Sequence, residues 1–116
     1  MEDSNDAIMV LDLAGHILAW NKGARQMYGW TESEALKMNI RELVPEDKQN
    51  EFKSVIKKIA TGETVKSFMS QQKTKAGKIL DIWITGTALM DESGRPTEIA
   101  ITERDLAWLA EKYGRQ

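Results

Sequence analysis

The hydrophobic pattern of this chain changes its period three times along the sequence, and the order of those changes restricts the possible folds more than any other feature. Two short apolar runs, at residues 8–12 and 16–20, are joined by the Ala14-Gly15 turn signal and predict a β-hairpin. A helical middle follows, and then three alternating segments that predict strands. Because the strands do not alternate with helices as βαβ units, we expect an α+β domain with an antiparallel sheet.

The longest helix signal lies in the middle of the chain. Pro45 suits a first helical position, and Gly62 suits the position just after the last. Between them, apolar residues recur at spacings of three and four, which predicts a stripe that faces a sheet. The residues of this stripe are Phe52, Val55, Ile56 and Ile59. Shorter helices are expected over 22–28 and over 32–38, the second after a capping box that starts at Thr31.

Three strands are expected after the long helix, over residues 65–75, 78–90 and 97–104, each antiparallel to the next. The middle strand has one apolar face made of alternate residues, and we expect that face on the core side of the sheet. This face comprises Leu80, Ile82, Ile84, Gly86 and Ala88. A last helix is expected over 106–113, with Asp105 as its N-cap.

The composition of the 116-residue chain, which has room for one domain, argues against several classes of function. Its 16 Lys and Arg residues are interspersed with 18 Asp and Glu residues, which argues against nucleic-acid binding. No apolar run approaches the roughly 18 residues that span a bilayer, so we expect a cytoplasmic chain without direct membrane insertion. Cysteine is absent and His16 is the single histidine. We therefore expect no catalytic triad, no metal site and no enzymatic activity.

Short motifs recur in order along nearly the whole chain. They are Asp6-Ala7-Ile8, Asp12-Leu13-Ala14-Gly15-His16-Ile17, Trp20-Asn21-Lys22-Gly23-Ala24, Tyr28-Gly29-Trp30, Glu34-Ala35-Leu36, Leu43-Val44-Pro45, Lys75-Ala76-Gly77-Lys78 and Arg104-Asp105-Leu106. With this series the chain resembles the PAS, or sensory box, family. The complete series at this spacing carries the resemblance, whereas no single tripeptide is specific.

The resemblance implies a five-stranded antiparallel sheet with strand order 2-1-5-4-3 and helices packed over one face around a pocket. It implies a PAS sensor domain over residues 1–105 and the start of a C-terminal linker or signalling helix over 106–116. Such modules sit beside an output domain in the same polypeptide. The resemblance favours a bacterial signalling receptor, a sensor histidine kinase of a two-component system, as the parent. A diguanylate cyclase or a transcription regulator is the alternative output.

Single residues of this chain indicate which cofactors of the family it could bind. In haem-binding members that resemble this chain, the axial histidine lies where this chain has Phe52, and phenylalanine cannot ligate iron. Light-sensing members use a flavin-reactive or chromophore-bearing cysteine, which this chain lacks. We therefore expect neither haem nor covalent flavin, and a non-covalent small molecule stays open. Asn21 either caps the following helix, the interpretation we favour, or makes a polar contact to such a ligand.

Apolar residues of the helices and the middle strand either fill the core or line a ligand pocket. The residues concerned are Met27, Phe52, Ile56, Ile59, Leu80, Ile82 and Ile84. Gly86 is more informative, because a glycine inside a strand often marks the close approach of another group. Since Gly86 shares the core face, we expect open space beside it and a small, partly apolar ligand there.

The outward face of the sheet and the last helix predict an interface. Trp83 alternates away from the core, so we expect a helix or a second subunit to cover it. Arg104 and Asp105 are either an ordinary surface pair or the junction that couples the sheet to the linker helix. Leu106 and Leu109 repeat at helical spacing on a helix too short to be stable alone. We expect a homodimer that is weak in isolation; the alternative is a ligand-free PAS module used for protein association.

Overall fold

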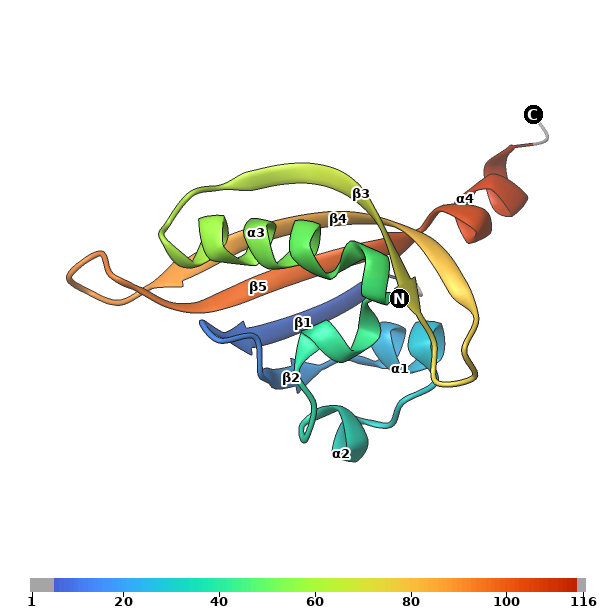
Figure 1. The fold of residues 1–116 in the computed structure, drawn as a ribbon, viewed down its shortest axis with the longest axis horizontal. Helices are drawn as coiled ribbons and strands as arrows, with labels where there is room; N and C mark the ends of the chain where they lie inside the picture. The colour runs from blue at the N-terminus through green and yellow to red at the C-terminus, as the bar shows by residue number, and fades with distance from the viewer. Residues whose placement is uncertain (1–5, 115–116) are drawn as a thin grey trace.

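A computed structural model describes residues 6–114, in which five strands form one antiparallel sheet (Figure 1). The strands are β1 (Ala7–Asp12), β2 (Ile17–Trp20), β3 (Val65–Lys73), β4 (Ile79–Met90) and β5 (Pro96–Asp105). Their order across the sheet is β2-β1-β5-β4-β3, which confirms the expected topology. The first and last strands lie side by side at the centre, where Ala7 pairs with Glu103 and Asp12 pairs with Glu98.

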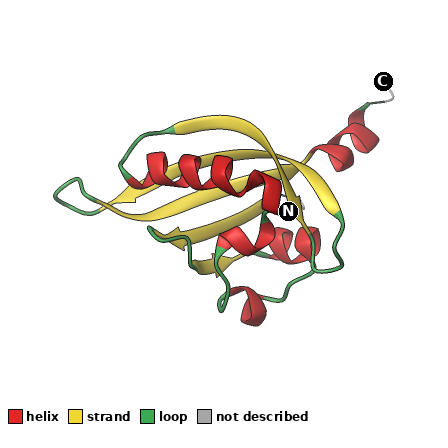
Figure 2. Ribbon diagram, in the orientation of Figure 1, coloured by secondary structure: helices red, strands yellow, loops and turns green. Residues whose placement is uncertain are grey.

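The helices cover one face of the sheet, except for the last helix (Figure 2). They are α1 (Lys22–Tyr28), α2 (Glu32–Ala35), α3 (Gln49–Ala60) and α4 (Leu106–Tyr113), with two 3-10 helices, η1 (Ile40–Leu43) and η2 (Glu46–Lys48). α1 packs on β1, and α3 packs on β3, β4 and β5. α4 continues from β5 and extends away from the body of the domain (Figure 1). Among residues 6–114, no helix has the length and apolarity that crossing a membrane requires. Residues 1–5 of the expected sensor domain and residues 115–116 of the expected linker helix lie outside the described residues.

Two expected elements are shorter than the sequence predicted. α2 ends at Ala35 instead of residue 38, because the amide of Met38 bonds back to the carbonyl of Ala35 and its own carbonyl accepts from Ile17 of β2 at 3.0 Å. β3 ends two residues early, because the amide of Lys75 donates to the carbonyl of Tyr28 at 2.8 Å. In both cases a tertiary hydrogen bond draws the backbone out of the regular element.

The long helix begins later than the sequence predicted. Pro45 precedes the 3-10 helix η2, and the amide of Lys48 donates to its carbonyl at 2.9 Å. α3 then starts at Gln49, whose side-chain amide donates to the carbonyls of Arg41 at 2.9 Å and Val44 at 2.7 Å. These two bonds tie the start of α3 to the end of η1.

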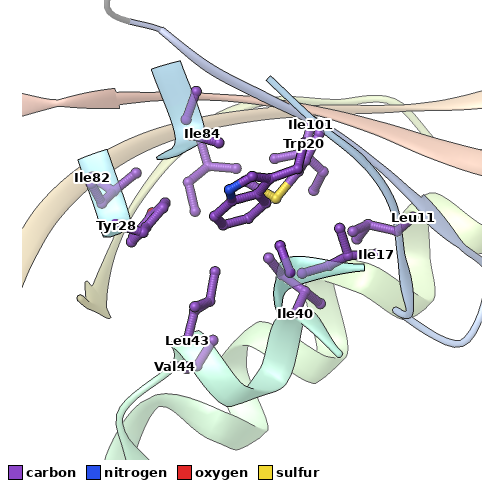
Figure 3. Packing of buried hydrophobic residues seen from close by; sticks show 14 of the residues in the cluster. Leu11, Ile17, Trp20, Tyr28, Ile40, Leu43, Val44, Ile82, Ile84 and Ile101 are labelled. Carbon is purple, nitrogen blue, oxygen red and sulfur yellow. The ribbon is translucent and has the colours of Figure 1, made fainter. Parts of the chain in front are cut away.

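The core lies between the inner face of the sheet and the helices. Alternate residues of β4 are buried and exposed from Ile79 to Thr87, which confirms the expected core face. In Figure 3, Ile40 and Leu43 point from η1 toward Trp20 and Tyr28 across the core. Fully burying an isoleucine or leucine stabilises a fold by about 1.5–3 kcal/mol. The inner face therefore holds the helices in place mainly through apolar burial.

Candidate functional site

The interior beneath α3 is filled. A Cβ atom added at Gly86 would lie 2.6 Å from Cδ1 of Ile59, so the Ile59 side chain occupies the open space that the sequence analysis expected beside this glycine. That expectation was wrong, because the residue that makes the close approach is a side chain of α3. Ile59, Ile82 and Ile84 are fully buried members of the apolar core.

The other expected pocket residues line two separate hollows. Met27 and Leu80 line a hollow of about 320 Å³ between α1, β4 and the start of α4. Phe52 and Ile56 line a groove of about 690 Å³ on the flank of α3. Neither hollow includes Gly86. The structure thus distributes the eight expected pocket residues over a packed core and two surface sites.

Asn21 has a structural role that uses both ends of its side-chain amide. Its Oδ1 accepts from the amide of Ala24 at 2.8 Å, as the N-cap of α1, and from the amide of Ile8 at 2.9 Å. Its Nδ2 donates to the carbonyl of Asp6 at 3.2 Å. The capping interpretation is confirmed, and the same side chain also fastens α1 to β1.

A buried polar cluster, made of Tyr28, Gln72 and Glu103, lies inside the domain where α1 meets the sheet. The Tyr28 hydroxyl donates to Oε1 of Glu103 at 2.5 Å, and Nε2 of Gln72 donates to the Tyr28 oxygen at 2.5 Å. Gln72 Nε2 also lies 3.1 Å from Glu103 Oε1. All three side chains are fully buried. The members come from α1, β3 and β5, so the cluster joins three elements that are far apart in sequence.

Burial dominates the ionisation of this cluster. It raises the pKa of Glu103 from 4.5 to about 7, although the hydrogen bonds from Tyr28 and Gln72 act in the opposite direction. Burial, followed by the charge of Glu103, raises the pKa of Tyr28 well above its ordinary value. Within residues 6–114, Oε1 of Gln72 and Oε2 of Glu103 have no hydrogen-bond partner. The Gln72 oxygen can only accept, whereas the Glu103 carboxyl accepts when it is ionised and can also donate when it is protonated.

This cluster was not predicted from the sequence, although the sequence contains a signal for it. Ile99, Ile101 and Glu103 alternate along β5 on its buried side. A glutamate that continues an apolar alternation at the inward position predicts a buried carboxyl. No comparable signal marks Gln72, because β3 has no regular alternation between buried and exposed residues.

The end of β5 joins the buried cluster to α4. Asp105, two residues beyond Glu103, caps α4 by accepting from the amides of Ala107 at 3.0 Å and Trp108 at 3.4 Å. Arg104 pairs with Asp6 through Nε and Oδ1 at 3.3 Å. Of the two alternatives given for Arg104 and Asp105, the ordinary surface pair is thus replaced by these two separate contacts, and the junction to the linker helix stays a prediction. Leu106 and Leu109, which were expected to need a partner surface, are half-buried.

The outward face of the sheet carries exposed apolar side chains. Trp83 is 39% exposed, so α4 leaves it open to solvent. Met69 of β3 pairs with Trp83 and is 58% exposed, and Ile8 of β1 is 45% exposed on the same sheet. Arg104 pairs with Trp83 from the other side. The outward placement of Trp83 is therefore confirmed, whereas the expected cover is not among residues 6–114.

Comparisons with known proteins converge on one family and fold. The family described as PAS fold matches residues 1–106. Among solved structures, the PAS domain of a protein from Colwellia psychrerythraea has a TM-score of 0.81 at 25% identity and covers 88% of this chain and 86% of that chain. A domain of a sensory box sensor histidine kinase/response regulator from Geobacter sulfurreducens has a TM-score of 0.75 at 23% identity, covering 90% and 86%.

A third similar structure comes from a study of a light-oxygen-voltage domain with a flavin analogue. It has a TM-score of 0.75 at 20% identity and covers 96% of this chain and 89% of that chain. Below 25% identity, such a likeness shows a shared fold. No curated protein has a significant match to the sequence.

Proposed function

The chain belongs to the PAS fold family, and on this premise we propose that it is the sensory and dimerisation module of a bacterial sensor histidine kinase. In this proposal the chain is cytoplasmic, catalyses no reaction, and either binds a small ligand or relays a signal to an output domain in the same polypeptide. One observation carries it: β5 bears the buried Glu103 and, two residues later, the cap of α4. A single strand thus connects the interior to the helix that would lead to the output domain.

The connection supplies a physical route for the signal. A change in the hydrogen bonds or the charge of the Tyr28, Gln72 and Glu103 cluster alters the balance of forces on the end of β5. Asp105 then holds the first turn of α4 more or less firmly, because the strength of an N-cap depends on its geometry. A helix of eight residues is marginal by itself, so a small change in its cap shifts its population.

The route is tested by the amide signals of α4 in nitrogen–proton correlation spectra. We expect Glu103→Gln to shift the signals of Ala107 and Trp108, which lie four and five residues further along the chain in α4. The matched control is Glu98→Gln, the same substitution on the same strand at a position that is not fully buried. Equal spectra of α4 in wild type and Glu103→Gln would contradict the proposed route.

Dimerisation is supported by the exposed apolar face around Trp83 and Met69. An exposed tryptophan beside an exposed methionine favours contact with another protein surface. Sedimentation of the chain at increasing concentration is expected to show a weak dimer. Trp83→Ser and Leu109→Asp should each reduce association. If wild type and both variants are monomeric at high concentration, the chain does not dimerise through this face.

We further propose that the chain binds neither haem nor a covalently attached flavin. The position of the haem ligand in related members is occupied by Phe52, which is buried and has no ligating atom. The absence of cysteine rules out a covalent flavin adduct, and Ile59 fills the interior beside Gly86. After incubation with haemin, the purified chain should show no Soret band on gel filtration. After incubation with flavin mononucleotide, it should carry no flavin that stays attached when the chain is denatured. Either signal would overturn this part of the proposal.

A further inference from the structure

The groove on the flank of α3 is built differently from the filled interior. Its volume of about 690 Å³ lies within the roughly 300–1,000 Å³ typical of small-molecule sites. One wall is α3, and the other is η1 together with the turn between β1 and β2. Phe52 and Ile56 face it from α3, and Ile40 and Leu13 face it from the opposite wall.

Hydrogen bonds hold the wall of η1 and the β1–β2 turn together and join this wall to the start of α3. The amide of Ile40 donates to the carbonyl of Gly15 at 2.8 Å, and Nδ2 of Asn39 donates to the carbonyl of Ala14 at 3.0 Å. On the other side, the Gln49 side chain joins the start of α3 to the carbonyl of Arg41 at 2.9 Å. The groove is therefore formed before any ligand arrives, which reduces the entropic cost of binding.

The charged side chains that line the groove are cations. Among residues 6–114, Arg41, Lys53 and Lys57 line it, and no Asp or Glu does. Within residues 6–114, none of these three side chains takes part in an ion pair. Lys53 and Lys57 stand four residues apart on α3, a spacing at which like charges repel. An anion in the groove would relieve that repulsion.

We propose that this groove binds a small amphiphilic carboxylate. The apolar body lies along Leu13 and the half-buried Ile56, and against the small exposed part of Phe52. The carboxylate lies among Arg41, Lys53 and Lys57. A guanidinium presents a planar pair of donors that matches a carboxylate, and two lysines add charge without fixing orientation. The inference rests on the proposed function, because it names the class of ligand that the sensory module would detect.

Three probes with the same chain length and different head groups test the proposal: octanoate, 1-octanol and octylammonium. Binding is followed by amide shifts in correlation spectra, below the concentrations at which the probes aggregate. We expect octanoate to shift the signals of Leu13, Ile40 and Ile56, and to bind about tenfold or more tightly than 1-octanol, with octylammonium weakest. Added salt should weaken octanoate binding and leave 1-octanol unchanged. Equal binding of the three probes, no octanoate binding, or saturation without shifts at the groove would overturn the proposal.

Charge-removing variants locate the carboxylate. Lys53→Gln and Lys57→Gln should each weaken octanoate binding about two- to fivefold, as expected for exposed ion pairs, without changing 1-octanol binding. Lys58→Gln is the matched control, since Lys58 is an exposed lysine of the same helix that does not line the groove. An equal loss in Lys58→Gln would place the anion outside the groove. The response of α4 to Glu103→Gln needs no ligand, so failure of the octanoate test and failure of the proposed function are observed separately.

Discussion

The interior beneath α3 and the interior beneath α1 are buried to the same degree but are built from different chemistry. Beneath α3, Ile59 packs into the space beside Gly86, and the contacts are apolar. Beneath α1, Tyr28, Gln72 and Glu103 depend on three hydrogen bonds and leave two oxygen atoms without a partner among the described residues. Apolar packing responds to volume alone, whereas a buried carboxyl also responds to protons and to donors. The polar half is thus where a chemical signal can change the state of the domain.

The largest effect on stability is expected in the apolar half. Ile59→Ala leaves a cavity beside Gly86 and should lower the free energy of unfolding by roughly 2–5 kcal/mol, with no dependence on pH. Gly86→Ala alone should also destabilise, because its new methyl group meets Cδ1 of Ile59 at 2.6 Å. In the double variant the methyl group refills part of the cavity, so the two effects should not add. Urea unfolding measures all three variants.

Ile79→Ala is the matched control for the apolar half, because Ile79 is 46% exposed on the same strand as Gly86. Ile79→Ala should lower the free energy of unfolding by far less than Ile59→Ala does. Strictly additive effects of Ile59→Ala and Gly86→Ala would mean that these two residues do not share one space.

The second effect is a pH dependence confined to the polar half. Because the pKa of Glu103 is about 7 in the folded chain and 4.5 when unperturbed, the unfolded chain releases this proton first as the pH rises. The contribution of the protonated carboxyl is fully present below pH 4.5 and is lost as the pH rises through about 7. The loss is on the order of 3 kcal/mol.

Urea unfolding between about pH 5 and about pH 8 measures this loss. Glu103→Gln should remove this pH dependence of the unfolding free energy, and Glu98→Gln should retain it. If the pH dependence persists in Glu103→Gln, another group causes it.

The third effect distinguishes the contribution of the cluster's hydrogen bonds to stability from the contribution of its packing. Tyr28→Phe retains the ring that lies 5.8 Å from Trp20 and removes the hydroxyl shared by Gln72 and Glu103. We expect a loss of about 1–3 kcal/mol, since two buried groups lose a partner. The pKa of Glu103 should rise further, because the hydrogen bond from Tyr28 lowers it. Tyr113→Phe, at an exposed tyrosine of α4, serves as the control. If the pH midpoint of the stability loss stays the same or falls in Tyr28→Phe, the hydrogen bond from Tyr28 does not lower the pKa of Glu103.

The smallest effect on stability is expected outside both halves. Trp83→Ser changes a side chain that is 39% exposed and lies beside Met69 and Arg104, so the unfolding free energy of the monomer should fall by about 1 kcal/mol or less. Measurement at low protein concentration keeps association from contributing. A loss as large as that of Ile59→Ala would show that the two faces of the sheet do not differ in the way that burial indicates.

Local sequence determined the elements and their caps. The alternation of β4, the N-caps Asn21 and Asp105, and the capping box at Thr31 all follow from residues within a few positions of one another. Such patterns are readable because a strand or a helix sets the geometry between near neighbours. The strand order came from the resemblance to a family, since spacing alone leaves several topologies open.

Tertiary structure alone decided what occupies the interior. The sequence marked Gly86 as a close approach, but only the fold identified Ile59 as the group that approaches it. Tyr28 and Glu103 are 75 positions apart, and Gln72 is 31 positions from Glu103. No local period relates residues at such separations. Their contact depends on how α1, β3 and β5 are placed by the whole core, and the pKa of Glu103 depends on the burial that this placement creates.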